Sequence, residues 1–244
     1  MLFDLPKSSQ RLHPFLESIA GLIRLRRESL SGLTSIDINS ELLNIKGKLD
    51  GEDVFIYNEF HRARGIRKLH LEIARLGIGL EILHCVFFPD PTFDIPIFGV
   101  DVVTTPKGIL AAVVDLSPVA NELSSEFKNE LSKISFPSFR RIRDLPDWGN
   151  IFSKYVQFIR PDGNDEEGYF LQIVDDYLRI LVDSLSSIEP EQEDSASTVE
   201  RFEFQQFYCI QQKRNEKTRN VLERVFNSEW ADQYIDKILF DVPS

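Results

Sequence analysis

The sequence predicts an α/β protein in which helices pack on a central, mainly antiparallel sheet. Strand-like segments cluster in the middle of the 244 residues, whereas helical segments lie at both ends and between them. The connections between consecutive strands are too short for the helical crossovers that parallel strands require. The chain is 42% hydrophobic and 27% charged, which suits a folded protein with a substantial core. We therefore expect residues 1–244 to form a single domain.

Several segments have the apolar spacing of helices. Residues 14–27 place Phe15, Ile19 and Ile23 on one face and end in basic residues. Residues 119–133 and 167–188 are also predicted to be helical, and the chain looks mainly helical from about residue 199. The acidic, serine-rich residues 189–198 interrupt this pattern, and we expect them to form a solvated loop.

Strands are predicted beside tight turns and in short apolar runs. Residues 42–58 alternate apolar and polar side chains around Asp50-Gly51, a pair that tolerates the backbone of a tight hairpin turn. Residues 95–103 and 109–115 are apolar enough for buried strands, and residues 151–161 alternate like another strand.

Residues 68–89 can be interpreted in two ways. As a helix, they carry an acceptable apolar stripe with a spacing of three or four residues. As a hairpin, two strands at 68–76 and 80–88 are joined around Gly77 and Gly79. We favour the hairpin, because β-branched and aromatic residues are dense after Gly79 and the two glycines suit a turn.

The hairpin brings ionisable side chains together. Because side chains alternate along a strand, His70 and Glu72 share one face, and Glu72 falls opposite His84 at a distance of about 4.5–5.5 Å. The next predicted strand carries Asp101 in apolar surroundings, where a carboxylate is either paired or neutral. An Asp and a His in one cavity titrate as a coupled pair, so either can hold a proton at neutral pH. The residues indicate an acid–base pocket, although each of them also suits an ordinary structural role.

Several classes of function are disfavoured. The net charge of −11 and the pI of 4.9 argue against attraction of nucleic acid or anionic lipid to the whole surface. Cys85 and Cys209 lie far apart without metal-ligand spacing, which favours a reducing compartment over a disulfide scaffold. The sequence has no dinucleotide-binding fingerprint, phosphate-binding loop or serine nucleophile motif. It shows no signal peptide or membrane-spanning run either, so we expect a cytoplasmic protein.

Five longer strings carry a more specific signal and span most of the chain. They are RKLHLEIARLG, LEILHCVFFPDPTFDIPIFGVDVV, AAVVDLSPV, RDLPDWGNIFS and NEKTRNVLERVF. In sequence and in order, they resemble the ferredoxin-dependent bilin reductases, above all the members that form phycocyanobilin. The resemblance implies a three-layer α/β/α sandwich that holds biliverdin IXα between the sheet and the C-terminal helices.

The resemblance also implies a reaction. Biliverdin IXα would be reduced to phycocyanobilin with four electrons, delivered singly by reduced ferredoxin through bilin radicals. The protein would bind no flavin, metal or NAD(P)H. Apart from the resemblance, we expect no nucleic-acid or membrane partner, and a monomer is the default because no apolar stripe is left over after the core is assigned. Two alternatives stay open, a reductase that forms another isomer such as phycoerythrobilin and a carrier that binds bilin without turnover. The carboxylate of Glu72 argues against the first, and three proton-exchanging side chains argue against the second.

Catalytic roles follow from the position of each residue in these strings. Asp101 would protonate the bilin near its central pyrroles, and His84 would bind the ring lactam oxygen and share protons with Asp101. Glu72 would serve the D-ring vinyl group. His70 would extend the proton path, a role for which strand packing is an equal alternative.

Binding roles are implied for residues on two later strings. Arg143 and Lys217 would bind the bilin propionates as cations beside carboxylates. Asn215 and Trp148 would line the pocket or its rim. Acidic ferredoxin would need a local basic face on this acidic chain. The candidates for that face are Arg62, Arg64, Arg67, Lys68, Arg140 and Arg141.

Overall fold

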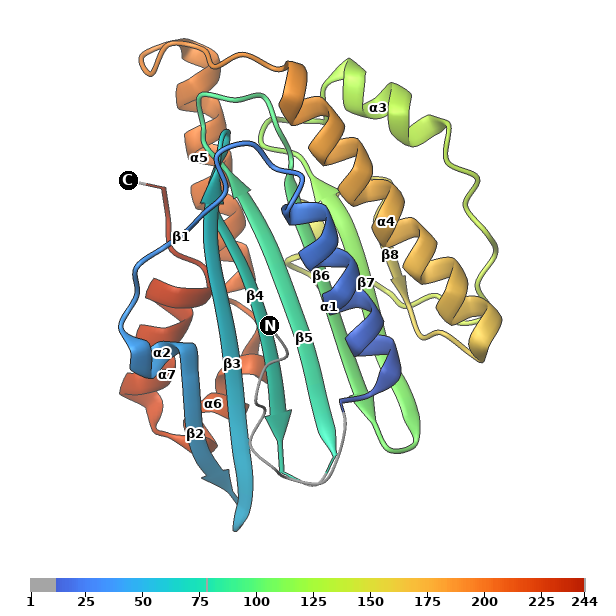
Figure 1. The fold of residues 1–244 in the computed structure, drawn as a ribbon, viewed down its shortest axis with the longest axis vertical. Helices are drawn as coiled ribbons and strands as arrows, with labels where there is room; N and C mark the ends of the chain where they lie inside the picture. Colours follow the sequence, from blue (N-terminus) through green and yellow to red (C-terminus); the bar gives the residue numbers. More distant parts are fainter. Residues whose placement is uncertain (1–11, 78, 244) are drawn as a thin grey trace.

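A computed structural model describes residues 12–77 and 79–243 of the chain (Figure 1). The strands within these residues form one eight-stranded sheet in the order β1-β3-β4-β5-β6-β7-β8, and β2 also pairs with β3. Each of these pairings is antiparallel, which confirms the predicted sheet type. The strands are β1 (Thr34–Ser35), β2 (Asn44–Leu49), β3 (Glu52–Ala63), β4 (Ile66–Leu76), β5 (Leu80–Pro89), β6 (Ile97–Thr105), β7 (Gly108–Ser117) and β8 (Gln157–Ile159).

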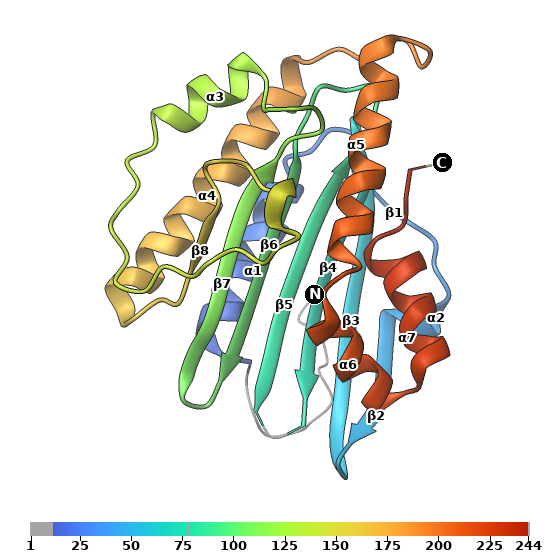
Figure 2. The same cartoon turned by 180° about the vertical axis from the view of Figure 1, so that it is seen from behind.

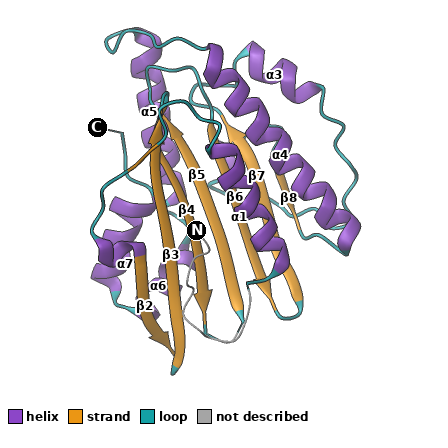
Figure 3. Ribbon diagram, viewed as in Figure 1, coloured by secondary structure: helices purple, strands orange, loops and turns teal. Residues whose placement is uncertain are grey.

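Helices cover both faces of the sheet and make the three layers of an α/β/α sandwich (Figures 1 and 2). One face carries α1 (Pro14–Arg27), α3 (Ser125–Ser132) and α4 (Asn164–Ser187). The other face carries α5 (Ala196–Gln212), α6 (Glu216–Val225) and α7 (Ser228–Tyr234). The short α2 (Ser40–Leu43) precedes β2, and two tight turns, η1 (Gly149–Ile151) and the π-helical η2 (Ile235–Leu239), complete the helical segments (Figure 3).

Two apolar cores hold the layers together. The first lies between the sheet and α1 and α4, and it includes Ile19, Phe87 and Tyr177. The second lies between the sheet and the C-terminal helices, and it includes Phe88 and Tyr234. Because successive strand residues point to opposite faces, the neighbours Phe87 and Phe88 enter different cores. A polar residue an even number of positions from Phe88 on the same strand therefore faces the C-terminal helices.

The predicted hairpins form around residues that accept left-handed backbone. Asp50 has a φ of 54° and Gly51 a φ of 89°, and this turn joins β2 to β3. Gly77 and Gly79 have φ values of 59° and 80° between β4 and β5. Non-glycine side chains rarely adopt such angles, so the glycines fix where the second hairpin turns. The hairpin interpretation of residues 68–89 is confirmed, while Ile78, at the predicted centre of the turn, lies outside the described residues.

The helix predicted over residues 119–133 is shorter than expected. It starts only at Ser125, as α3. The preceding segment crosses from one side of the sheet to the other, because Val119 is buried in the second core and Leu123 in the first. A continuous helix could not place both side chains in this way.

The strand predicted over residues 151–161 is wrong for most of its length, since β8 covers only Gln157–Ile159. Ser153 is drawn inward instead. Its backbone N–H donates to Asp115 Oδ2 at 2.8 Å, and its hydroxyl donates to Asp115 Oδ1 at 2.5 Å. These bonds divert the backbone from sheet pairing until Gln157.

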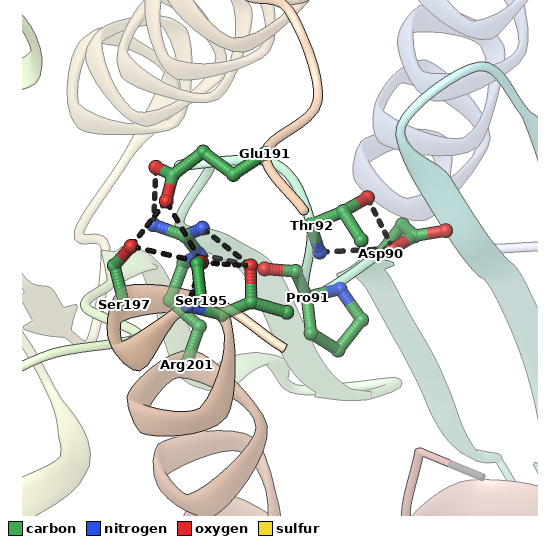
Figure 4. A network of polar contacts seen from close by, with 8 residues as sticks. Asp90, Pro91, Thr92, Glu191, Ser195, Ser197 and Arg201 are labelled. Carbon is green, nitrogen blue, oxygen red and sulfur yellow. Dashed lines mark hydrogen bonds and ion pairs between the residues drawn. The ribbon is translucent and has the colours of Figure 1, made fainter. Parts of the chain in front are cut away.

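The acidic segment 189–198 is more ordered than the predicted solvated loop. Helix α5 already begins at Ala196. The buried Arg201 guanidinium donates to the Pro91 carbonyl at 2.6 Å and contacts Glu191 at 3.1 Å (Figure 4). The backbone N–H of Glu191 donates to the Thr92 carbonyl at 2.8 Å. Arg201 thereby ties α5 to the connection between β5 and β6.

Candidate active site

A row of polar side chains crosses four neighbouring strands. Asn58 on β3 lies opposite Glu72 on β4, Glu72 lies opposite His84 on β5, and His84 lies opposite Asp101 on β6. The register predicted from the sequence for Glu72 and His84 is therefore confirmed. The row faces the C-terminal helices, since Tyr234 of α7 bonds Glu72 and the Phe240 ring lies 5.7 Å from the His84 ring, centroid to centroid.

His84 and Asp101 form the less buried half of the row. His84 Nδ1 lies 3.8 Å from Asp101 Oδ2, and the Asp101 side chain is 39% exposed. Within the described part of the chain, His84 Nε2 and Asp101 Oδ1 have no hydrogen-bond partner. An imidazole and a carboxylate at this distance can pass a proton through one small movement or through a bound group.

Glu72 forms the buried half of the row. The Tyr234 hydroxyl oxygen lies within hydrogen-bond distance of Glu72 Oε2, at 2.6 Å. Burial raises the pKa of Glu72 above its ordinary value, while the charge of His84 and the bond with Tyr234 oppose this rise. Glu72 therefore keeps its proton to a higher pH than an exposed glutamate does, which suits a proton donor.

His70 lies behind the row, two residues before Glu72 on the same strand. Its ring stacks on Phe60 with centroids 4.3 Å apart, and its Nε2 lies 2.8 Å from Asn58 Oδ1. Burial, and then the charge of Lys68, lower its pKa well below the ordinary value, so the ring is neutral. The structure thus brings His70, Glu72 and His84 into one neighbourhood, with ring centroids of the two histidines 6.2 Å apart.

The floor around His84 and Asp101 is apolar and only half covered. Ile82, Val103 and Val113 are partly exposed on this face, whereas the residues between them on the opposite face are buried. Figure 2 shows that the described helices leave the lower parts of β5, β6 and β7 uncovered. An apolar floor with a few converging polar groups is typical of a site for a flat, mainly apolar ligand.

The predicted binding residues occupy two segments at some distance from the row. Arg143 is exposed and donates from Nη1 to the Leu110 carbonyl of β7 at 2.9 Å. Trp148 is partly buried in the second core, with its ring 6.2 Å from that of Phe152. Both belong to the segment before β8, on the β7 side of the uncovered floor.

Asn215 and Lys217 lie at the start of α6. The Asn215 side chain caps this helix by accepting a bond from the Lys217 backbone N–H at 3.2 Å. The Lys217 side chain is exposed in the first turn. Asn215 thus has a structural role as a cap, and the binding roles of all four residues stay predictions.

Two residues that sequence reasoning missed complete the polar row. Tyr234 bonds Glu72, and Asn58 bonds both His70 and Tyr234. Strand alternation alone does not find Asn58, because a β-bulge between His61 and Ala63 shifts the register of β3 against β4. No sequence pattern links Tyr234 to a strand 162 residues earlier.

A groove of about 1370 Å³ lies apart from the row, between the start of α5 and the C-terminal segment. Its lining includes Phe60 and Lys68 but none of Glu72, His84 and Asp101. We place the candidate active site at the row rather than in this groove, because the proton-exchanging groups converge at the row.

Three of the predicted docking cations bind within the chain instead. Lys68 is buried and pairs with Asp241, and it also donates to the Ile238 carbonyl at 2.8 Å. Arg67 pairs with Asp241 at 2.8 Å, and Arg64 donates to main-chain carbonyls after α4. Because Lys68 is buried, its ammonium group is not available to bind ferredoxin. Arg67 and Arg64 already bind groups of the chain itself. The exposed candidates are Arg62, Arg140 and Arg141.

Searches for two other features gave negative results over residues 12–77 and 79–243. No helix there is long and apolar enough to cross a membrane. No group of three or more His, Cys, Asp and Glu side chains there is arranged to hold a metal ion.

Comparison with known proteins places the chain in a family. A family model described as "Ferredoxin-dependent bilin reductase" matches residues 21–241. The phycocyanobilin:ferredoxin oxidoreductase of Prochlorococcus marinus (strain SARG) is 56% identical over 95% of this chain and 94% of its own. The protein of the same name from Synechococcus sp. (strain CC9902) is 54% identical over 96% and 95%.

A solved structure shares the fold. Phytochromobilin synthase from tomato, crystallised in complex with biliverdin, aligns with a TM-score of 0.75 over 93% of this chain and 82% of its own, at 19% identity. This likeness confirms the α/β/α architecture. Taken with the match of the family model over nearly the whole length, the comparisons show that the chain belongs to the ferredoxin-dependent bilin reductases.

Proposed function

We propose that this chain reduces biliverdin IXα to phycocyanobilin. Four electrons would arrive singly from reduced ferredoxin, and four protons would be added, so that bilin radicals are intermediates. The observation that carries the proposal is the row of Glu72, His84 and Asp101 on the uncovered apolar floor. Relatives more than 50% identical over nearly the whole chain bear the name of this activity.

Each side chain of the row has a proposed task. Each electron added to the bilin makes it more basic, so a nearby acid must follow with a proton. Asp101, the exposed member, protonates the bilin near its central pyrroles, and His84 binds the lactam oxygen and exchanges protons with Asp101. Glu72, whose pKa burial raises, donates to the D-ring vinyl group.

The site would hold the substrate through its two propionate side chains. Arg143 and Lys217 would bind the two propionates, which are charged and need not be buried. Both side chains are exposed, and their segments come from different sides of the floor. Trp148 would lie against the bilin edge from the same segment as Arg143. Electrons need no resident cofactor in this scheme, since the bilin itself accepts them from ferredoxin.

One anaerobic assay tests the proposal. Biliverdin, reduced ferredoxin and the protein are mixed, and the bilins are separated and identified against standards. The expected product is phycocyanobilin. A product that keeps the D-ring vinyl group would contradict the phycocyanobilin assignment, and a phycoerythrobilin-type product would favour the other isomer. Binding without consumption of biliverdin would mean that the chain is a carrier.

A further inference from the structure

The orientation of Asn58 is set by its surroundings. Asn58 is buried, and its Nδ2 donates to the Leu42 carbonyl at 2.7 Å. The amide oxygen must then point the other way, toward His70 and Tyr234. It lies 2.8 Å from His70 Nε2 and 3.0 Å from the Tyr234 hydroxyl. An amide oxygen can only accept, so both neighbours have to donate to it.

The Tyr234 hydroxyl has two short oxygen neighbours but a single proton. Its oxygen lies 3.0 Å from Asn58 Oδ1 and 2.6 Å from Glu72 Oε2. If Glu72 were ionised, the single Tyr234 proton would have to serve two acceptor oxygens, Asn58 Oδ1 and Glu72 Oε2. One of the two contacts would then bring two oxygen lone pairs together with no proton between them. If Glu72 is protonated, its O–H donates to Tyr234 while the Tyr234 O–H donates to Asn58. Only the second arrangement gives each contact a proton.

The environment of Glu72 agrees with a neutral acid. Tyr234 and His70 are almost completely buried, and Glu72 is 9% exposed. The charged or titratable groups that act on Glu72 are His84 from β5, Asp101 from β6 and Tyr234 from α7. On the same strand, His70 is neutral and donates its Nε2 proton to Asn58, and Lys68 beyond it is paired with Asp241.

We propose that Asn58 is a positioning residue: by holding the Tyr234 hydroxyl proton, it keeps Glu72 as a neutral carboxylic acid in the resting protein. The protonation state does not depend on the proposed function, whereas its use in bilin reduction does. When the Glu72 O–H bond breaks and its proton forms a C–H bond on the bilin, the Tyr234 O–H turns from Asn58 to the new carboxylate. Tyr234 therefore accepts from the acid before the transfer, and it donates to the carboxylate only after the proton has left.

Infrared spectroscopy of the substrate-free protein tests this directly. The spectrum of the parent minus that of Glu72→Gln should show, at neutral pH, the carbonyl stretch of a protonated carboxylic acid. In Asn58→Leu, the Tyr234 proton is released to Glu72, and the acid dissociation constant of Glu72 should rise about tenfold or more, which is about one pKa unit. The band should then disappear at a correspondingly lower pH.

Two further variants sharpen the test. Asn58→Leu with Tyr234→Phe removes the released donor, so the band should titrate at or above the pH of the parent. Tyr234→Phe alone should keep the band, shift its frequency and move its titration upward. Tyr208→Phe is the matched control. The Tyr208 hydroxyl lies on the same side of the sheet but bonds Gln212 instead of Glu72, so its removal should leave the band unchanged.

The outcomes separate this inference from the proposed function. Absence of the acid band at neutral pH, or an unchanged titration in both Asn58→Leu and Tyr234→Phe, would overturn the inference. If the infrared titration shifts as predicted but the protein does not consume biliverdin, the proposed function is contradicted and this inference is not. In an active protein, the pH above which D-ring reduction slows should fall in Asn58→Leu together with the infrared titration. Thermal unfolding of each variant verifies that it is folded.

Discussion

Glu72 on β4 lies directly opposite His84 on β5, and both side chains face the C-terminal helices. The pairing places a buried carboxyl group, whose pKa is raised by burial, beside an imidazole that in turn faces a partly exposed carboxylate, Asp101. The three groups therefore differ in access to solvent along one line. In the proposed reaction, this gradient would allow one sheet to deliver protons to different parts of an extended substrate.

Replacing Asp101 with Asn should arrest the reaction early. An amide is no acid, so the first bilin radical would lose its proton donor. General acid catalysis contributes about 10²–10⁴-fold, and we expect the radical to decay at least about 100-fold more slowly than in the parent. Electron paramagnetic resonance after anaerobic mixing with reduced ferredoxin measures this decay. The control is Asp53→Asn, which replaces an exposed aspartate of the same sheet. If the radical decayed at the parental rate in Asp101→Asn, Asp101 would not be the proton donor.

Asp115 should make the stability of the protein depend on pH. Burial raises its pKa from 3.8 to about 6, although bonds from Ser153 and Ser117 oppose the rise. Since the folded pKa is raised, its stabilising contribution is complete below pH 4 and is lost as the pH rises through about 6. Asp115→Asn does not titrate.

The free energy of unfolding of the parent, relative to Asp115→Asn, should fall by about 2 kcal/mol between pH 4 and pH 7. Urea denaturation at each pH measures the difference. A difference that stays constant over this range would mean that Asp115 titrates normally.

The C-terminal segment is held by a buried ion pair that should matter for stability. Asp241→Asn leaves the Lys68 ammonium buried without a counter-ion, because its other contacts are main-chain carbonyls. We expect a loss of about 2–3 kcal/mol in the free energy of unfolding, somewhat below a fully buried pair because Asp241 is partly exposed. Lys68→Met combined with Asp241→Asn should recover part of this loss. Equal stability of the parent and Asp241→Asn in urea would show that the pair contributes nothing.

Ferredoxin binding should depend on exposed cations and weaken with salt. Arg141 is 53% exposed, and Arg140 lies beside it. Arg141→Gln should raise the apparent KM for ferredoxin at low ionic strength and flatten its dependence on salt. Arg179→Gln, an exposed arginine on α4 with the same change of charge, is the matched control. If added salt leaves the apparent ferredoxin affinity of the parent unchanged, docking through these cations is wrong.

The sequence predictions were accurate for features that depend on neighbouring residues, and they failed for contacts between residues far apart in the chain. The turn at Asp50-Gly51 and the alternation around Glu72 involve neighbouring residues, and the structure confirms both. The partnership of Tyr234 with Glu72 and that of Lys68 with Asp241 join residues more than 160 positions apart. These contacts follow from how the C-terminal helices pack on the sheet.

Segments whose path is set by tertiary packing were also mispredicted. Residues 119–124 have helical spacing, yet their two apolar side chains enter opposite cores. Arg67 and Lys68 look like surface cations in the sequence, because nothing local shows that Asp241 returns to them. The family strings pointed to candidate site residues, but they gave no account of the bonds that hold those residues in place.

The most direct test of the account is the product formed by Glu72→Gln. An amide at this position keeps the shape of the side chain but cannot donate an acid proton. With biliverdin and excess reduced ferredoxin under anaerobic conditions, we predict that this variant accumulates a partly reduced bilin that retains its D-ring vinyl group. Formation of phycocyanobilin at the parental rate would contradict the role of Glu72 and, with it, the proposal that the row supplies the protons.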